Sequence, residues 1–487
     1  MRLLPPLALL ALAAPFAFAQ SPAPRTLTLE QAVQTAHGNN PAFRQVENNL
    51  RTQESQVREA YAALLPSAST NLNALYQQAG TQYFQGVPIP GSADTYQSSY
   101  FLGLSYRLSG AALFAPKAAR ANRDAADADI TNQGALLRSQ VTTQYLNALQ
   151  QQATAALNDT LVQTADGQLE LAKAKMAAGG GTILDVRTAE VALGQAQVLA
   201  LTAHNQAVIE KLKLFQLMGV PADTTTQLTT TFSVTAPPAS LDSLLSLARH
   251  VNPDVEARRA RQVAAQAQLN ANRTSYLPSL SISTGWGGNS FSYASSDYVV
   301  NSAIAAQTRN YNSCIAFDSV RVGAGLNAMD CGSPTLSADA LAAKRASNSG
   351  FPFKFNRSPF GVSASVSLPI FNNWQREAQI EQSQVLRDNA AYDVRARSLQ
   401  LTTDVTQAYL TLVTAERTVE LQTQNAQKAT EELAFAEESY RVGAKTFLDV
   451  TTARGQYEKA VIDRLNAVYD YHKDYAALEN AVGRPLR

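Results

Sequence analysis

The chain has 487 residues, a formal net charge of +1 at pH 7 and only 16% charged residues. This balance gives no electrostatic case for binding nucleic acid or a strongly acidic partner, and the length allows two or three ordinary domains. Ala, Gln, Thr, Ser and Asn occupy many positions that Lys and Glu take in a typical soluble protein. Such a composition favours surfaces that face a water-filled lumen or other helices.

Residues 1–19 are expected to be a signal peptide. An apolar run from Leu3 to Phe18 is broken by prolines, and the small residues Ala17 and Ala19 stand at positions −3 and −1 of a cleavage site before Gln20. The run is too short for a bilayer span, and no later stretch approaches about 18 consecutive apolar residues. If the exported chain spans a membrane, it must therefore use β-strands.

Residues 20–221 form the first of two predicted repeats. Thr28 and Gln31 have the spacing of a capping box and open an amphipathic helix that is interrupted at Asn40-Pro41. Two strands are predicted over about 67–108, because polar and apolar residues alternate there. A long helical hairpin follows, with its tip near 179–185, and a helix of about 60 residues would make a rod of roughly 90–100 Å.

Residues 241–487 repeat the same order after a linker or equatorial segment at 222–240. The helix-breaking prolines are 212 residues apart in both cases, Pro41 to Pro253 and Pro66 to Pro278. Such self-similarity indicates a tandem duplication. The further parts of the second repeat are strands at about 279–291 and 358–368, a long connecting loop over about 290–357, and a hairpin with its tip near 443–449.

The two hairpin tips share the sequence Gly-x-x-Thr-φ-Leu-Asp-Val, where φ is apolar, at Gly179–Val186 and Gly443–Val450. Each glycine is expected to form the turn at a helix C-terminus. The threonine of each tip is expected to cap the returning helix, and the aspartate lies in the first turn, where the helix dipole favours an acid.

The only two cysteines, Cys314 and Cys331, lie in the predicted long loop. In an exported chain they favour one local disulfide. A metal pair is the alternative, and it is disfavoured because no histidine or further cysteine lies nearby.

The predicted fold class is a mostly α-helical membrane protein in which each chain supplies long helical hairpins and four transmembrane β-strands. Four strands in a bilayer leave two outer edges with unpaired backbone groups, which is costly in hydrocarbon. Closure therefore requires other subunits. Three chains would give twelve strands, an allowed even number, and two or four chains remain open alternatives.

Together these features resemble the TolC-type outer-membrane efflux proteins. The resemblance covers about 27–485 and rests on the duplicated Asn-Pro helix, on Leu-Pro-Ser before the first strand of each repeat, on Leu368-Pro369-Ile370-Phe371, and on the two tips. It implies a homotrimeric twelve-stranded barrel in the outer membrane, continuous with a periplasmic α-helical barrel. The long loop would face outside and either cover the mouth or serve surface recognition.

The resemblance further implies a passive channel of a tripartite efflux or type I secretion system. Its partners would be a periplasmic adaptor protein, an inner-membrane pump and outer-membrane lipid. The exported substrate is not indicated by the sequence. A surface-exposed structural or adhesive outer-membrane protein is the alternative function, and a periplasmic adaptor is a weaker rival because strands precede each hairpin.

The resemblance also implies two roles for the tips. Docking of the adaptor is expected to involve Gly179, Thr182, Leu184, Val186, Gly443, Thr446, Leu448 and Val450. Polar links that hold a periplasmic gate closed are expected at Asp185, Tyr440, Lys445 and Asp449. The expected links are a Lys445–Asp185 ion pair and a hydrogen bond donated by Tyr440. The alternative is solvated helix-end charges, since an exposed ion pair contributes only about 0–1 kcal/mol.

No catalytic, metal or cofactor site is predicted, and the chain is not expected to be an enzyme. The four histidines lack ligand spacing, and neither glycine-rich tip has the Gly-x4-Gly-Lys-Ser/Thr pattern of a phosphate loop. Trp286 is expected to be an anchor at a membrane interface.

Overall fold

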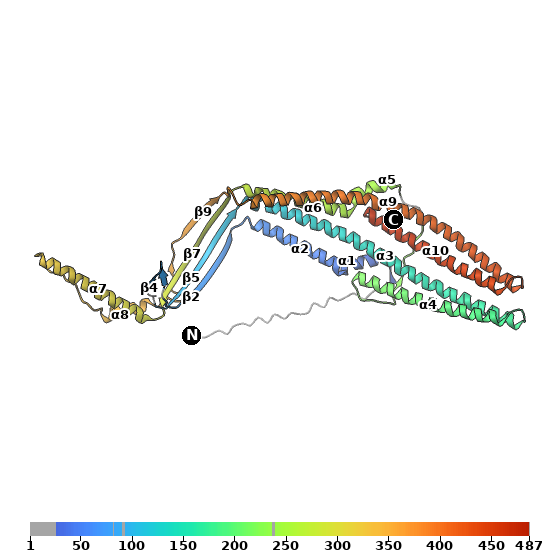
Figure 1. Ribbon diagram of the computed structural model, residues 1–487, viewed down its shortest axis with the longest axis horizontal. Helices are drawn as coiled ribbons and strands as arrows, with labels where there is room; N and C mark the ends of the chain where they lie inside the picture. The colour runs from blue at the N-terminus through green and yellow to red at the C-terminus, as the bar shows by residue number, and fades with distance from the viewer. Residues whose placement is uncertain (1–25, 81, 90–92, 236–238, 487) are drawn as a thin grey trace. The chain divides into compact units, whose positions relative to one another are not determined.

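The computed structural model describes residues 26–80, 82–89, 93–235 and 239–486, so the predicted signal peptide lies outside the described residues. The chain divides into two compact units, each drawn in Figure 1. The hairpin unit comprises residues up to Val57, Lys117–Leu269 and the residues from Glu381 on, and the sheet unit comprises Arg58–Pro116 and Asn270–Ile380. Both predicted repeats contribute to both units, because strands of the two repeats pair in one sheet and their helices share cores.

The helices, in chain order, are α1 (Leu29–Asn39), α2 (Pro41–Ala62), α3 (Gly110–Ala177), α4 (Ile183–Met218), α5 (Leu241–Val251), α6 (Pro253–Arg273), α7 (Ser296–Gly323), α8 (Ala338–Ser347), α9 (Gln375–Arg441) and α10 (Phe447–Val482). The main strands are β2 (Ser67–Gln77), β5 (Thr95–Leu108), β7 (Ser279–Tyr293) and β9 (Gly361–Ser367). The shorter elements are β1 (Thr26–Leu27), β3 (Gln82–Phe84), β4 (Val87–Ile89), β6 (Gln227–Leu228), β8 (Asn356–Arg357) and a 3-10 turn at Thr274–Tyr276.

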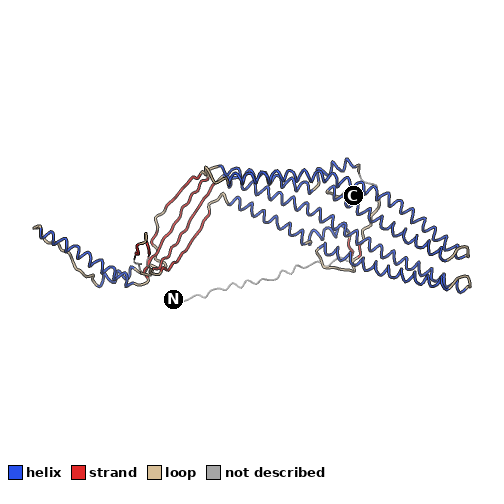
Figure 2. Tube along the Cα trace, in the orientation of Figure 1, coloured by secondary structure: helices blue, strands red, loops and turns tan. Residues whose placement is uncertain are grey.

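The sheet is antiparallel, in the order β2–β5–β7–β9, with β8 pairing the far end of β7 beside β9 (Figure 2). These strands lie where the alternation of the sequence predicts them. Each outer strand, β2 and β9, pairs with only one strand among the described residues. The outer edges of the sheet therefore present backbone groups that one copy of the chain does not pair.

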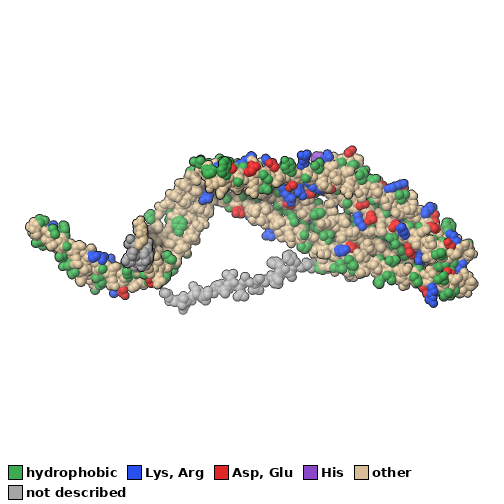
Figure 3. All heavy atoms as spheres, in the orientation of Figure 1, with side chains coloured by type: hydrophobic (Ala, Val, Ile, Leu, Met, Phe, Trp, Pro, Cys, Tyr) green, Lys and Arg blue, Asp and Glu red, His purple; other side chains and the backbone are tan. Residues whose placement is uncertain are grey.

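The strand register sorts the side chains into an apolar and a polar face. Leu102 of β5 lies opposite Trp286 of β7, and Leu280 lies opposite Val366 of β9, so these side chains share one face. Trp286 is half exposed on that face and packs against Phe360, with 5.3 Å between ring centroids. Charged side chains are sparse over the strands in Figure 3. The opposite face is mostly serine, asparagine and glycine, including Ser67, Ser69, Asn71, Asn73, Ser99, Gly103, Ser281, Ser283, Gly285, Ser363, Ser365 and Ser367.

The expectation of a long loop over about 290–357 is wrong for much of its length. β7 extends to Tyr293, and α7 and α8 follow it, so the segment between β7 and β8 is largely helical. The side chain of Ser295 accepts a hydrogen bond from the backbone nitrogen of Asp297 (3.2 Å) and caps α7. Cys314 of α7 is joined to Cys331 by a disulfide.

An asparagine at each Asn-Pro junction ties a short helix to the hairpin unit. Asn40 donates to the carbonyl oxygen of Leu217 (2.7 Å) and accepts from the backbone nitrogen of Phe43 (2.9 Å). Asn252 likewise donates to the carbonyl oxygen of Ala481 (3.0 Å). Each asparagine therefore caps the next helix and satisfies a carbonyl at the C-terminal end of α4 or α10.

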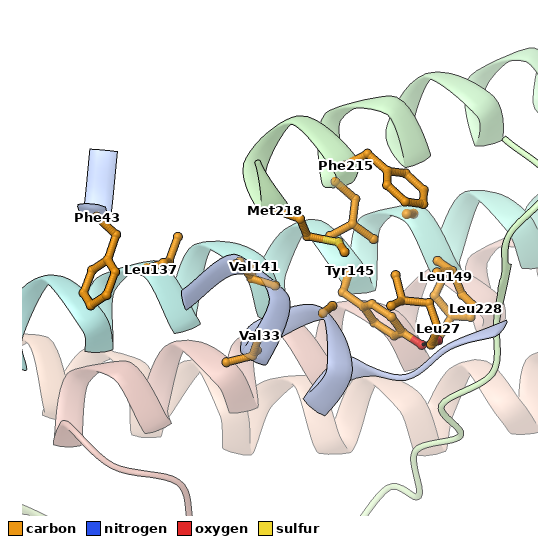
Figure 4. Packing of buried hydrophobic residues seen from close by; sticks show 14 residues of the cluster. Leu27, Val33, Phe43, Leu137, Val141, Tyr145, Leu149, Phe215, Met218 and Leu228 are labelled. Carbon is orange, nitrogen blue, oxygen red and sulfur yellow. Dashed lines mark hydrogen bonds between the residues drawn. The ribbon is translucent and has the colours of Figure 1, made fainter. Parts of the chain in front are cut away.

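Two apolar cores lie beside these junctions. In the first, the fully buried Tyr145 of α3 donates a hydrogen bond to the carbonyl oxygen of Leu27 (2.8 Å), which holds β1 against the hairpin (Figure 4). The second core surrounds Tyr471 of α10. The first contains Leu27, Val33, Phe43, Leu137, Val141, Tyr145, Leu149, Phe215, Met218 and Leu228, and the second contains Leu244, Val255, Leu401, Val405, Leu412, Tyr471, Tyr475 and Leu478.

Gly219 provides a direct test of how the first Asn-Pro junction is packed. Its φ is +72°, and a Cβ there would lie 2.4 Å from the carbonyl oxygen of Asn39. We predict that Gly219→Ala lowers the free energy of unfolding by at least about 1–3 kcal/mol, because backbone strain and the clash add. The measurement is the unfolding midpoint followed by circular dichroism in detergent.

Gly194→Ala is the matched control, because Gly194 lies within α4, the helix that Gly219 terminates, and a Cβ there would have no neighbour within 4 Å. This variant should unfold at the wild-type midpoint or slightly above it, since alanine favours a helix interior. Equal midpoints for the two variants would contradict this account of the junction.

Candidate functional site

The two hairpin tips end their outgoing helices with the same hydrogen-bonded turn. Gly179 has a φ of +78°, its nitrogen donates to the carbonyl oxygen of Met176 (3.0 Å), and the nitrogen of Gly180 donates to that of Lys175 (3.0 Å). Gly443 (φ +82°) and the residue after it repeat both bonds in the second tip. This is the Schellman motif, in which a left-handed residue closes a helix C-terminus. The glycines therefore have a structural role.

The threonine and aspartate of each tip form a capping box. The backbone nitrogen of Thr182 donates to Asp185 Oδ2 (2.9 Å), and the Thr182 hydroxyl accepts from the backbone nitrogen of Asp185 (3.2 Å). Thr446 and Asp449 do the same at 2.8 and 3.4 Å. The bond from the Thr446 backbone, together with its hydroxyl, holds the pKa of the Asp449 carboxyl below its usual value. Both carboxylates thus stabilise the start of a returning helix.

One apolar cluster joins the two tips, which turn at the same end of the hairpin unit in Figure 1. Tyr440 is only 4% exposed and packs against Phe447 with 5.5 Å between ring centroids. The members of this tip cluster come from all four hairpin helices: Leu169, Ala172, Val186, Ala189, Leu433, Ala436, Tyr440, Phe447, Val450 and Ala453. The two hairpins are therefore packed together in one chain before any partner binds.

The tip cluster divides the predicted docking residues into two groups. Leu184 and Leu448 are 71% and 74% exposed, so they are available to a partner. Val186 and Val450 are buried in the cluster, so the prediction that they present a docking surface is wrong for this structure. Each valine lies two residues after the exposed leucine of its tip, on the side of the helix that faces the other hairpin. Sequence reasoning missed the exposed Val442, whose apolar character beside the turn was the available signal.

The predicted Lys445–Asp185 ion pair is not formed within one copy of the chain. Lys445 makes no salt bridge in the part of the chain that the structure describes, and the Asp185 carboxylate is directed to the Thr182 backbone. Lys445 acts on Asp449 instead, because its charge further lowers the pKa of that carboxyl.

Lys175 links the two tips in a way that the sequence did not reveal. Its ammonium nitrogen lies 4.3 Å from the centroid of the Tyr440 ring and donates a hydrogen bond to the Tyr440 carbonyl oxygen. Below this contact, Gln168 donates to Glu437 (3.0 Å) and also bonds Arg454 (3.4 Å). These contacts join residues 265 to 286 positions apart, so local sequence patterns carry no signal for them.

Tyr440 does not donate the predicted hydrogen bond. Its hydroxyl oxygen is buried and has no hydrogen-bond partner among the described residues. Burial, followed by the charge of Asp185, raises the pKa of this hydroxyl, so it stays protonated at neutral pH. The ring therefore contributes apolar contacts and a cation–π surface to the tip, and the hydroxyl is an unsatisfied donor.

Comparison with known proteins assigns the family. Residues 32–220 and 332–484 match the model of the outer membrane efflux protein family, and the two segments make up more than half of the chain. The chain belongs to the outer membrane efflux protein family. Membership makes this chain an outer membrane protein. In the residues that the structure describes, no helix is long and apolar enough to cross a membrane.

The curated relatives of this outer membrane efflux protein include two from Pseudomonas putida. They are the probable efflux pump outer membrane protein SepC and the toluene efflux pump outer membrane protein TtgF, each from a different strain of that organism. Each is 27% identical over 270 residues, which are 54% of this chain and 54% of the relative. The chain thus matches about half the length of these relatives.

Solved structures of outer membrane channels share the fold of this efflux protein. VceC from Vibrio cholerae has a TM-score of 0.68 at 16% identity, covering 94% of this chain and 97% of VceC. CmeC from Campylobacter jejuni has a TM-score of 0.69 at 14% identity, covering 93% and 85%. At these identities the likeness establishes the fold alone.

The unpartnered hydroxyl makes Tyr440→Phe an informative substitution. We predict that it leaves the unfolding midpoint unchanged or raises it, because it removes a buried donor that has no acceptor. Tyr440→Ala should cost about 3–5 kcal/mol, because it empties the centre of the tip cluster. The measurement is thermal unfolding, combined with hydrogen exchange of the tip residues. A loss of tip protection in Tyr440→Phe would instead indicate that the hydroxyl donates a structural hydrogen bond.

Proposed function

We propose that three copies of this outer membrane efflux protein assemble into a passive export channel. In this assembly, twelve strands form a closed barrel in the outer membrane, and the hairpins of the tandem repeats form a continuous helical tube in the periplasm. The single observation that carries the proposal is the sheet of four main strands, whose outer edges are unpaired among the described residues and which has one apolar face and one polar face. Such a sheet satisfies its backbone in lipid only when further copies pair with β2 and β9.

The polar face of the sheet is proposed to line the lumen. Its serines, asparagines and glycines suit contact with water, and the apolar face with Trp286 suits contact with lipid. On the polar face the ring of Phe101 lies over glycines, since a Cβ at Gly103 or Gly285 would come within 2.5 Å of it. This position keeps the ring close to the backbone of the sheet.

We propose that the channel works with a periplasmic adaptor and an inner-membrane pump. The exposed Leu184 and Leu448, with the turns at Gly179 and Gly443 and the caps Thr182 and Thr446, are the proposed adaptor contacts. Efflux is favoured over polypeptide secretion because both curated relatives are named as parts of efflux pumps. The comparisons offer no support for an adhesive role.

Cysteine substitutions on adjacent residues of β9 test the channel. Ser365 lies on the polar face and Val366 on the apolar face. In planar bilayers we predict that a cationic thiol reagent lowers the single-channel conductance of Ser365→Cys and leaves Val366→Cys unchanged. The native cysteines form a disulfide and do not react. A wild-type protein without conductance, or an equal effect at both positions, would reject the proposed channel.

The gate at Asp185, Lys445 and Asp449 is proposed as a ring of charge at the periplasmic entrance, and the buried Tyr440 is not part of it. In a trimer the three Asp449 carboxylates, ionised at neutral pH, would favour cations. Because Lys445 makes no salt bridge among the described residues of its own chain, we propose that it pairs with an acid of a neighbouring copy when the gate is closed. We predict that combined Lys445→Ala and Asp185→Ala substitutions raise single-channel conductance. Unchanged conductance would remove these residues from the gate.

A further inference from the structure

The segment between β7 and β8 forms an arm at one end of the sheet. The arm comprises α7, the returning segment 324–337 and α8 (Figures 1 and 2). Helix α7 lies between the two segments that match the family model, so it is not part of the matched family pattern. Its 28 residues correspond to a rod of about 42 Å.

The returning segment covers one side of α7 and holds it in place. Gln307 donates to the carbonyl oxygen of Ser333 (2.8 Å), Asp318 accepts from the backbone nitrogen of Met329 (2.7 Å), and Cys314 forms the disulfide with Cys331. The three helix positions are seven and four residues apart, so they share one face of α7. The arm is therefore a braced helix, and its remaining surface has a defined orientation.

A flank of α7 beside the braced face carries exposed and partly buried apolar side chains at heptad spacing. Ile304, Tyr311, Ile315 and Val322 are separated by seven, four and seven residues. Ile304, Ile315 and Val322 are 39%, 45% and 51% exposed, and Tyr311 between them is partly buried. Phe317 and Val320, which are 60% and 70% exposed, lie on other sides of the helix. Hydrophobic side chains also gather at the free end of the arm in Figure 3. Heptad spacing of this kind is the pattern of a helix that packs against another helix at a shallow angle.

The charges of α7 do not suit an isolated helix in water. The helix has four charged residues, Asp297, Arg309, Asp318 and Arg321, which sum to zero. A helix so exposed needs either a charged surface or neighbours along its length. A lipid headgroup surface would be expected to face a cluster of lysines and arginines, which α7 lacks. A neutral, apolar seam fits a partner of the same composition.

We infer that α7 packs against α7 of the neighbouring copies, so that three arms form a parallel helical bundle beyond the barrel. This inference rests on the proposed trimer. Pairing of β2 and β9 between copies would hold the arms at the same level, because each arm leaves its sheet from the end of β7. Equivalent seams, from Ile304 to Val322, would then meet over about 27 Å. The partner is a second copy of this chain, and α7 is its contact surface.

Disulfide crosslinking of adjacent arm positions tests the bundle. Ile304→Cys and Tyr311→Cys place a thiol in the seam, whereas Ala305→Cys and Asn312→Cys place one about 100° further round the helix. All four are made in the full chain, purified in detergent and oxidised mildly. Non-reducing electrophoresis should show at least ten times more crosslinked dimer for each seam variant than for its neighbour. Light scattering on the same samples gives the number of copies.

The two proposals fail in different ways. A trimer whose seam and control variants crosslink equally, or not at all, would overturn the arm bundle and leave the channel proposal standing. A monomer in solution would overturn the trimer and the bundle together. A lipid-facing seam would also overturn the bundle. It would appear as stronger quenching by spin-labelled lipid of a fluorophore at Ile304→Cys than at Ala305→Cys in reconstituted vesicles.

Discussion

Helices of 68 and 67 residues, α3 and α9, dominate this chain, and helices of that length need lateral neighbours to be stable. Each is accompanied by a returning helix of 36 residues, and the buried face of α4 is largely alanine, with small side chains three and four residues apart. The Schellman turns and capping boxes at the tips end one helix and begin the next without leaving backbone groups unpaired. Each hairpin therefore satisfies the backbone groups at its own tip. The shared tip cluster then joins one hairpin to the other, so that the tips behave as one body within each chain.

The same requirement for neighbours governs the sheet unit, where it is not met within one chain. Serine-rich and apolar faces alternate along every strand, and the outer edges of β2 and β9 have no partner among the described residues. A soluble sheet of this kind would invite aggregation, whereas copies that close around a lumen use the free edges and both faces.

Asp185 and Asp449 show how a structural role and a proposed gating role coexist. Their carboxylates cap helices within the chain, which explains their position without any reference to transport. Lys445, by contrast, has no salt bridge in the described residues. A link that holds a gate and breaks on opening is expected to be weak and repeated by symmetry, since single exposed pairs contribute about 0–1 kcal/mol. The strong contacts at the tips are the buried ones around Tyr440 and Lys175, and these lie within one copy.

The sequence by itself determined the elements whose signals are local. Alternation located the four strands, the Gly-x-x-Thr pattern located both tips with their turns and caps, and the Asn-Pro pairs located the interrupted helices. Such features depend on residues within a few positions of one another. Only the tertiary structure decided that Val186 and Val450 are buried while Leu184 and Leu448 are exposed, because that depends on where the second hairpin packs. The contact of the Lys175 ammonium with the Tyr440 ring could not be predicted from the sequence for the same reason. Helix α7 was missed because its apolar residues are scattered among small polar residues and do not follow the period of an amphipathic helix. The seam from Ile304 to Val322 could be recognised only once the braced face of the helix was known.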